Sequence, residues 1–101
     1  IKMSTMPQGA NNVWTVQSAV TVGSSAAQTD VTNANMLTIH LGAEIYINFG
    51  SSSTAASSSA NDIILGAGVH SLVVPKSGTV AQYLNYSRVG GANVTMRLVF
   101  N

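Results

Sequence analysis

Cysteine is absent from this chain of 101 residues, so no disulfide framework stabilises it and no thiol is available for nucleophilic or redox chemistry. Charged side chains are scarce as well: they make up 7% of the residues, against about 25% in an ordinary globular domain. Four cations and three carboxylates leave a formal net charge of +1. Because phosphates and anionic lipids both bind to clustered cations, we expect neither nucleic acid nor a membrane to be a partner.

Long hydrophobic runs and helical patterns are also missing. No apolar run approaches the roughly 18 residues that a membrane-spanning helix requires. No segment carries an apolar stripe of 3.6-residue period over the length of a helix. Since 46% of the residues are nevertheless apolar, the chain can build a small core, and the pattern predicts that strands build it.

The residues that usually carry chemistry are few and scattered. His40 and His70 are the only imidazoles, and neither a Cys pair nor an H-E-x-x-H motif accompanies them to complete a zinc site. The acidic residues Asp30, Glu44 and Asp62 are isolated, which disfavours a calcium loop and selects no pair of catalytic carboxylates. Serines are so numerous that a Ser-His-Asp combination arises by chance, and no G-x-S-x-G motif supports one. We therefore expect no enzyme, no catalytic or metal-binding residue and no cofactor.

The chain does contain a strict alternation of apolar residues with other residues. Between residues 37 and 49 every second position is apolar: Leu37, Ile39, Leu41, Ala43, Ile45, Ile47 and Phe49. Successive side chains of a strand point to opposite faces, so this stretch has one apolar and one polar face. Gly42 lies in its middle, which leaves two readings: one strand bent at a bulge, or two strands meeting at a corner.

Shorter stretches repeat the signal at residues 13–22, 80–86 and 94–100, and two apolar runs flank a glycine pair within residues 62–76. Residues 23–35 predict a long connection or a short edge strand. Residues 50–61 predict a Ser-rich loop, which is either a flexible connection or an exposed tip. Turn signals every 8–12 residues are typical of sandwiches and barrels. The sequence therefore predicts an all-β protein with one small antiparallel β-sandwich, jelly-roll-like or immunoglobulin-like, of six to seven strands over residues 13–101.

An extended N-terminal arm is expected over residues 1–12, which lack periodicity. Met3 and Met6 would supply adaptable apolar contacts there, with Trp14 just behind them. Tyr46 lies on the polar face of its predicted strand, as an interface anchor, a sugar-stacking platform or a plain edge residue. These four side chains are our candidate partner contacts. Ile1 in place of an initiator methionine indicates that an upstream segment was removed or that the numbering starts inside a longer product.

Several short motifs occur in an informative order: a strand ending in Phe49-Gly50, a loop of small residues at 51–60, the turn Leu65-Gly66-Ala67-Gly68 and the segment Asn93-Val94-Thr95. Over about residues 17–100 this order resembles small β-sandwich virion proteins of tailed bacteriophages, although Gly66 stands where that pattern has proline. The resemblance implies a capsid decoration or cement protein that binds the major capsid protein lattice on the capsid exterior. A neck, tail or fibre module is the lesser alternative within the virion. No catalytic residue is implied.

Low charge is itself typical of chains that assemble, because little repulsion opposes association. We expect a homo-oligomer, with a trimer as one arrangement that would bury apolar area between copies. Two other classes stay open. A carbohydrate-recognising or receptor-binding tip domain would need exposed aromatics in a groove, and a pilin-like or surface-layer subunit would assemble without any host lattice.

Overall fold

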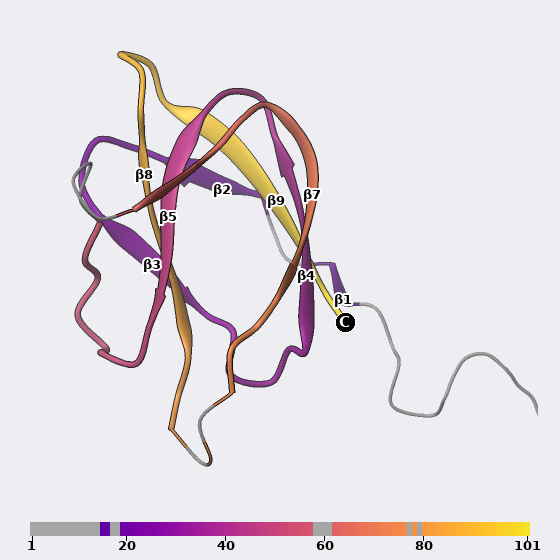
Figure 1. Ribbon diagram of the computed structural model, residues 1–101. Coiled ribbons are helices and arrows are strands. Elements are labelled where there is room, and N and C mark those ends of the chain that lie inside the picture. The colour runs from indigo at the N-terminus through magenta and orange to yellow at the C-terminus, as the bar shows by residue number, and fades with distance from the viewer. Residues whose placement is uncertain (1–14, 17–18, 58–61, 77, 79) are drawn as a thin grey trace, which may run out of the picture.

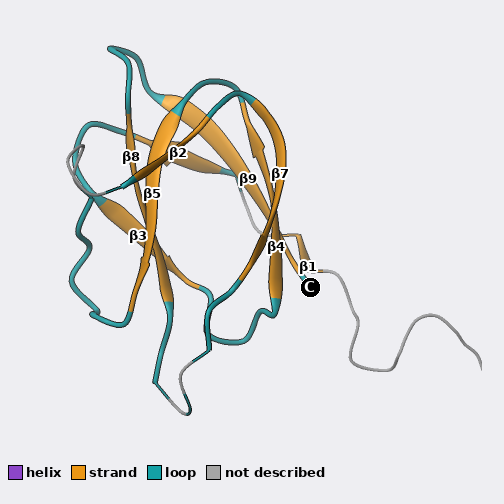
Figure 2. Cartoon of the chain, in the orientation of Figure 1, coloured by secondary structure: helices purple, strands orange, loops and turns teal. Residues whose placement is uncertain are grey.

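The computed structural model describes residues 15–16, 19–57, 62–76, 78 and 80–101, and these form a β-sandwich (Figure 1). The strands are β1 (Thr15–Val16), β2 (Val20–Val22), β3 (Ala27–Asp30), β4 (Met36–Leu41), β5 (Ile45–Gly50), β6 (Ile63–Leu65), β7 (Gly68–Val73), β8 (Tyr83–Arg88) and β9 (Val94–Phe100). No helix occurs in the described residues (Figure 2), and hence none there is long and apolar enough to cross a membrane. The predicted all-β antiparallel sandwich is confirmed.

Strand order identifies the kind of sandwich. One sheet runs β1–β9–β4–β7, with β2 following β1 along the same side of β9, and the other runs β3–β8–β5–β6. The pairs β2–β9, β3–β8, β4–β7 and β5–β6 are nested, as if one long hairpin had been rolled up. This is the strand order of a jelly roll and not that of an immunoglobulin domain.

Nine strands occur in the described residues, against the six or seven expected, because residues 13–22 contribute both β1 and β2 and a corner divides residues 37–49 into β4 and β5. The alternating stretch is not one strand, because β4 and β5 belong to different sheets and residues 42–44 turn the chain between them. Ala43 has apolar parity yet is exposed at this corner. The second corner, at Gly66 and Ala67, separates β6 from β7 and again switches sheets. Gly68 begins β7 with a φ of 118°, a conformation that side chains other than glycine rarely adopt.

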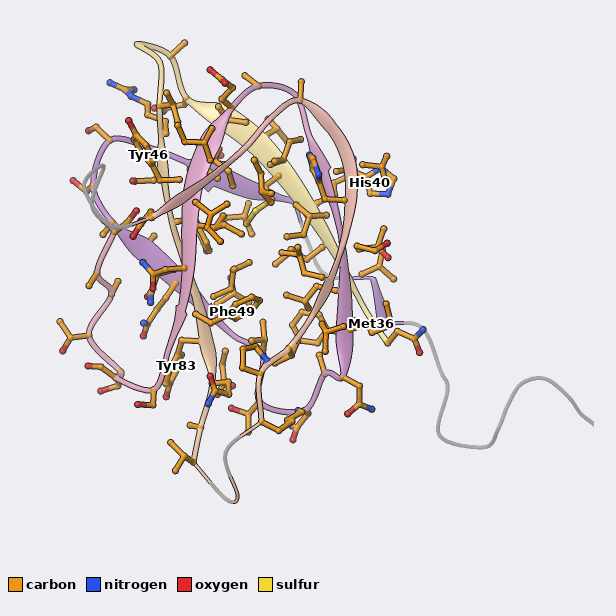
Figure 3. The ribbon with its side chains drawn as sticks, in the orientation of Figure 1. Met36, His40, Tyr46, Phe49 and Tyr83 are labelled. Atoms are coloured by element: carbon orange, nitrogen blue, oxygen red, sulfur yellow. The ribbon has the colours of Figure 1, made fainter. Side chains whose placement is uncertain are left out.

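The core lies between the two sheets, where their inward side chains meet (Figure 3). Its fully buried large side chains come from β2, β4, β5, β8, β9 and two loops: Leu37, Ile39, Ile45, Leu84, Met96, Leu98, Val22, Val31 and Val74. Phe49 and Phe100 pack against the margin of this cluster. The alternation therefore marks the inward face correctly in β4, β5 and β9.

Candidate interaction surfaces

Three of the four predicted partner contacts, Met3, Met6 and Trp14, lie outside the described residues, as does the predicted arm at residues 1–12. The fourth is placed. Tyr46 lies on β5 between the buried residues Ile45 and Ile47, so its ring points outward from the second sheet (Figure 3). It is half-buried.

An exposed apolar patch includes Tyr46 and its register partner on β6. Register places Ile64 of β6 beside Tyr46, and Ile64 is 50% exposed. We call Tyr46 and Ile64 the β6 patch. Ile63 pairs with the inward residue Ile47, so its side chain leaves the other face of β6, and it is 65% exposed because β6 is the last strand of its sheet. An exposed aromatic–aliphatic pair is a candidate site of protein contact.

Sequence reasoning identified Tyr46 but not the exposed residues of β6. A signal for them exists: Ile63, Ile64 and Leu65 are consecutive, and a strand cannot turn all three inward. A short apolar run is also typical of a fully buried strand, so the run by itself does not show which of its side chains face solvent. Only the position of β6 at a sheet edge shows that two of the three side chains face solvent.

A second apolar edge belongs to the first sheet. β7 is its outermost strand, and Val69 and Val73 on its outward face are 62% and 72% exposed. Ser71 lies between them on the same face, also exposed. Met36 of β4 pairs with Val73 and is itself exposed. We call Val69, Ser71 and Val73 the β7 edge.

Next to the β6 patch, the outward face of the second sheet carries a network of polar side chains. Gln28, Asn85 and Asn48 stand in one row across β3, β8 and β5. The Gln28 amide donates to Asn85 Oδ1 at 2.9 Å, and the Asn85 amide donates to Asn48 Oδ1 at 2.8 Å. Asn85 is only 4% exposed although it points away from the core.

The Ser-rich loop covers this network. Asn48 donates to the carbonyl oxygen of Ala56 at 2.7 Å, and Gln28 donates to that of Ser52 at 3.2 Å. The Ser57 hydroxyl donates to Asp62 Oδ2 at 2.6 Å and lies 2.7 Å from the Ser87 hydroxyl. The described part of the loop, residues 51–57, is therefore anchored on the sheet at several points, which a freely flexible connection would not be.

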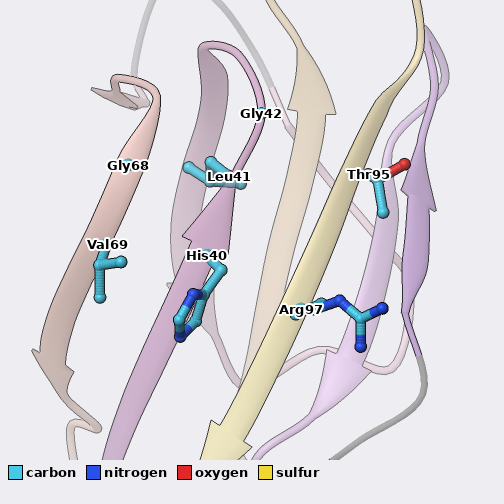
Figure 4. Close-up of a pocket in the computed structure, with 7 residues that line it drawn as sticks. All are labelled: His40, Leu41, Gly42, Gly68, Val69, Thr95 and Arg97. Carbon is cyan, nitrogen blue, oxygen red and sulfur yellow. The ribbon is translucent and has the colours of Figure 1, made fainter.

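A hollow of about 270 Å³ opens on the outward face of the first sheet (Figure 4). Its lining comes from β4, β7, β9 and the first corner: His40, Leu41, Gly42, Gly68, Val69, Thr95 and Arg97. Arg97 stands directly opposite His40 across the β4–β9 pair, and both side chains are exposed. Guanidinium, imidazole and hydroxyl groups can donate hydrogen bonds to a small polar or anionic group. The hollow is open, and its lining residues other than Leu41 are exposed, so water reaches these donors.

The two histidines are not brought together. His40 pairs with Val69 and His70 with Ile39, so their side chains lie on opposite faces of the sheet. His70 Nε2 lies 2.8 Å from the carbonyl oxygen of Gly66, a contact that ties β7 to the corner before it. Within the described residues, no three His, Asp or Glu side chains come together in a way that could hold a metal ion.

Hydrogen bonds from Thr32 change the pKa of Asp30. The Thr32 hydroxyl and backbone N–H donate to Asp30 Oδ1 at 2.6 and 2.9 Å, and these bonds lower the pKa of Asp30 from its ordinary value. The same Thr32 hydroxyl accepts from the backbone N–H of Gln82 at 3.0 Å, and Lys76 donates to the Thr32 carbonyl. The cluster stabilises the turn after β3.

Comparison with protein-family models, with curated proteins and with solved structures found no match.

Proposed function

We propose that this domain is a non-enzymatic virion structural protein, a capsid decoration protein that binds the lattice of the major capsid protein on the capsid exterior. The observation that carries the proposal is the β6 patch: Tyr46 and Ile64 form an apolar surface on the outward face of the second sheet, on a domain with a net charge of only +1. An aromatic side chain beside an aliphatic one is typical of an anchor in a protein interface.

The size of the patch favours a repeated contact over a single strong one. Burying the exposed parts of two side chains gains on the order of 3 kcal/mol, at roughly 25 cal/mol per Å² of apolar surface. That gain corresponds to a dissociation constant of roughly millimolar or weaker. Such a contact becomes effective when many copies, or several contacts of one copy, engage the same symmetric lattice.

The N-terminal arm is the proposed second contact. β1, to which residues 1–14 lead, lies at the edge of the first sheet opposite β7. This edge belongs to the first sheet, whereas the β6 patch lies on the second sheet, so the two would serve as separate contacts. In this proposal Met3, Met6 and Trp14 lie against an adjacent subunit, where an extended segment can add to a sheet.

Imaging of the particle in which the chain occurs, together with its copy number, tests the proposal. Hundreds of copies on the outer capsid surface would support it. A handful at a vertex or tail would overturn the decoration role in favour of a neck, tail or fibre module, and absence from every particle would overturn the virion assignment. Ile64→Lys should lower the occupancy on the particle, whereas Thr21→Lys, an exposed residue of β2, should leave it unchanged.

A carbohydrate- or receptor-binding tip domain is the second candidate, and the hollow is the observation that favours it. His40, Thr95 and Arg97 present donors around an open depression of about 270 Å³. No Phe, Tyr or Trp side chain is among its lining residues, so hydrogen bonds would contribute more than stacking to holding a sugar there. Binding on an array of acidic and neutral glycans that Arg97→Gln abolishes would support this function, and equal binding by both proteins would refute it.

A further inference from the structure

We propose that β7 pairs antiparallel with β7 of a second copy of this chain, about a two-fold axis through Ser71, so that the two first sheets become continuous. The inference does not depend on the virion assignment, and it uses a different surface from the β6 patch. Figure 4 shows β7, β4 and β9 side by side with β7 outermost.

The sheet edges in the described part of the chain differ in how well they are protected. A free edge exposes unpaired N–H and C=O groups, and soluble proteins usually protect it by shortness, charge, proline or a bulge. At the other edges, β1 and β2 have two and three residues, β6 has three, and β3 has four and ends in Asp30. β7 has six residues with neither a charged side chain nor a proline. It is thus the longest of these edges and the least protected.

The sequence of β7 is suited to a copy of itself. Val69, Ser71 and Val73 alternate along its outward face, so the pattern is symmetric about Ser71. In an antiparallel pair centred there, Val69 lies opposite Val73 of the partner subunit, and Ser71 lies opposite Ser71 of the partner subunit. Val69 and Val73 are 62% and 72% exposed in the single chain. The two-fold axis creates two equivalent Val69–Val73 contacts between the copies, so each valine is covered by the other valine of the partner subunit.

The other face of the strand and the net charge are also compatible with this register. His70 lies opposite the partner's Leu72 on the inward side, and no like charges meet along the strand. The net charge of +1 per chain adds little repulsion. Cross-strand pairs of β-branched residues stabilise a sheet, whereas an arbitrary partner strand would have to match this pattern by chance.

The absence of native cysteine provides a direct test of the register. In Ser71→Cys the two thiols would face each other with Cα atoms about 4.5–5.5 Å apart, inside the usual disulfide range. Mild oxidation should give a covalent dimer about tenfold faster than in Thr95→Cys, because paired thiols react at high effective concentration. Thr95 is the matched control, an exposed residue on the same outward face but on β9.

Val73→Lys is the second variant. Val73 is 72% exposed, so the substitution should leave the circular dichroism spectrum unchanged while placing a charge against the partner's Val69. It should abolish the Ser71→Cys disulfide and convert the wild-type dimer to a monomer in sedimentation velocity. A monomeric or trimeric wild-type chain at the highest soluble concentration, or equal cross-linking of the two cysteine variants, would overturn the inference.

Discussion

Asn48 is the side chain whose removal should cost most among the polar residues at the surface, and Asn48→Ala tests the polar network over the second sheet. Its amide donates to the Ala56 carbonyl at 2.7 Å and to Asp62 Oδ1 at 3.0 Å, and its Oδ1 accepts from Asn85 at 2.8 Å. Alanine removes all three bonds. It also leaves the Asn85 amide, on a residue that is 4% exposed, without this acceptor.

The magnitude follows from the kinds of bond that are lost. A neutral hydrogen bond contributes about 1 kcal/mol net, and one to a carboxylate about 1.5–3 kcal/mol. The three sum to about 4 kcal/mol, and water entering at the half-buried position should recover part of this, so we expect a loss of about 3 kcal/mol in the free energy of unfolding. That is a large fraction of the 5–15 kcal/mol typical of a domain, and it should lower the melting temperature by more than about 10 °C.

Urea unfolding followed by far-UV circular dichroism measures the loss, and limited proteolysis locates it. Elastase cleaves after small residues, so Asn48→Ala should speed cleavage beside Ala55 and Ala56 in the released loop. Asn93→Ala is the matched control, because Asn93 is exposed and accepts one bond from Arg88 at 2.6 Å. If the two variants lie within about 0.5 kcal/mol of each other, the network does not hold the loop on the sheet.

Two further predictions concern the turn after β3 and the core. Thr32→Val removes the hydroxyl donor to Asp30 and should raise the pKa of Asp30 toward 3.8, as measured by NMR titration of its carboxyl carbon. Because the folded-state pKa of Asp30 is lowered, Asp30 stabilises the fold above its unfolded-state pKa, and this stabilisation is lost as the pH falls through its folded-state pKa. Thr32→Val should therefore lose less stability on acidification than the wild type. A pKa of Asp30 that is unchanged in the variant would refute the assignment. Leu37→Ala should destabilise the fold by about 3 kcal/mol, since Leu37 is fully buried, whereas Met36→Ala at the exposed neighbouring position should cost less than about 1 kcal/mol in the same urea assay. Equal costs would mean that the inward face of β4 has been misassigned.

Alternation along the chain was sufficient to predict which side chains of a strand share a face. It placed Leu37, Ile39 and Leu41 inward and Tyr46 outward, and the structure agrees. It also predicted an all-β fold and ruled out a helical one. These features are local, because the direction of a side chain depends on its position within its own strand.

The same pattern was misleading where tertiary structure intervened. Ala43 has the parity of a core residue but lies exposed at the corner where the chain leaves one sheet for the other. Ile63 and Ile64 belong to a short apolar run, yet both are exposed because β6 lies at the edge of its sheet. A corner and an edge depend on which strands are neighbours, and residue types within a strand do not specify that.

Asn48 and Asn85 show most clearly which features depend on the local sequence and which depend on the tertiary structure. The sequence by itself determined that both side chains leave the apolar face, because each alternates with inward residues. Only the tertiary structure decided that β5 pairs with β8, so that the two amides meet, and that the Ser-rich loop folds over them. The period of a strand is encoded in adjacent residues, whereas strand order and register arise from contacts between distant segments that compete for one core.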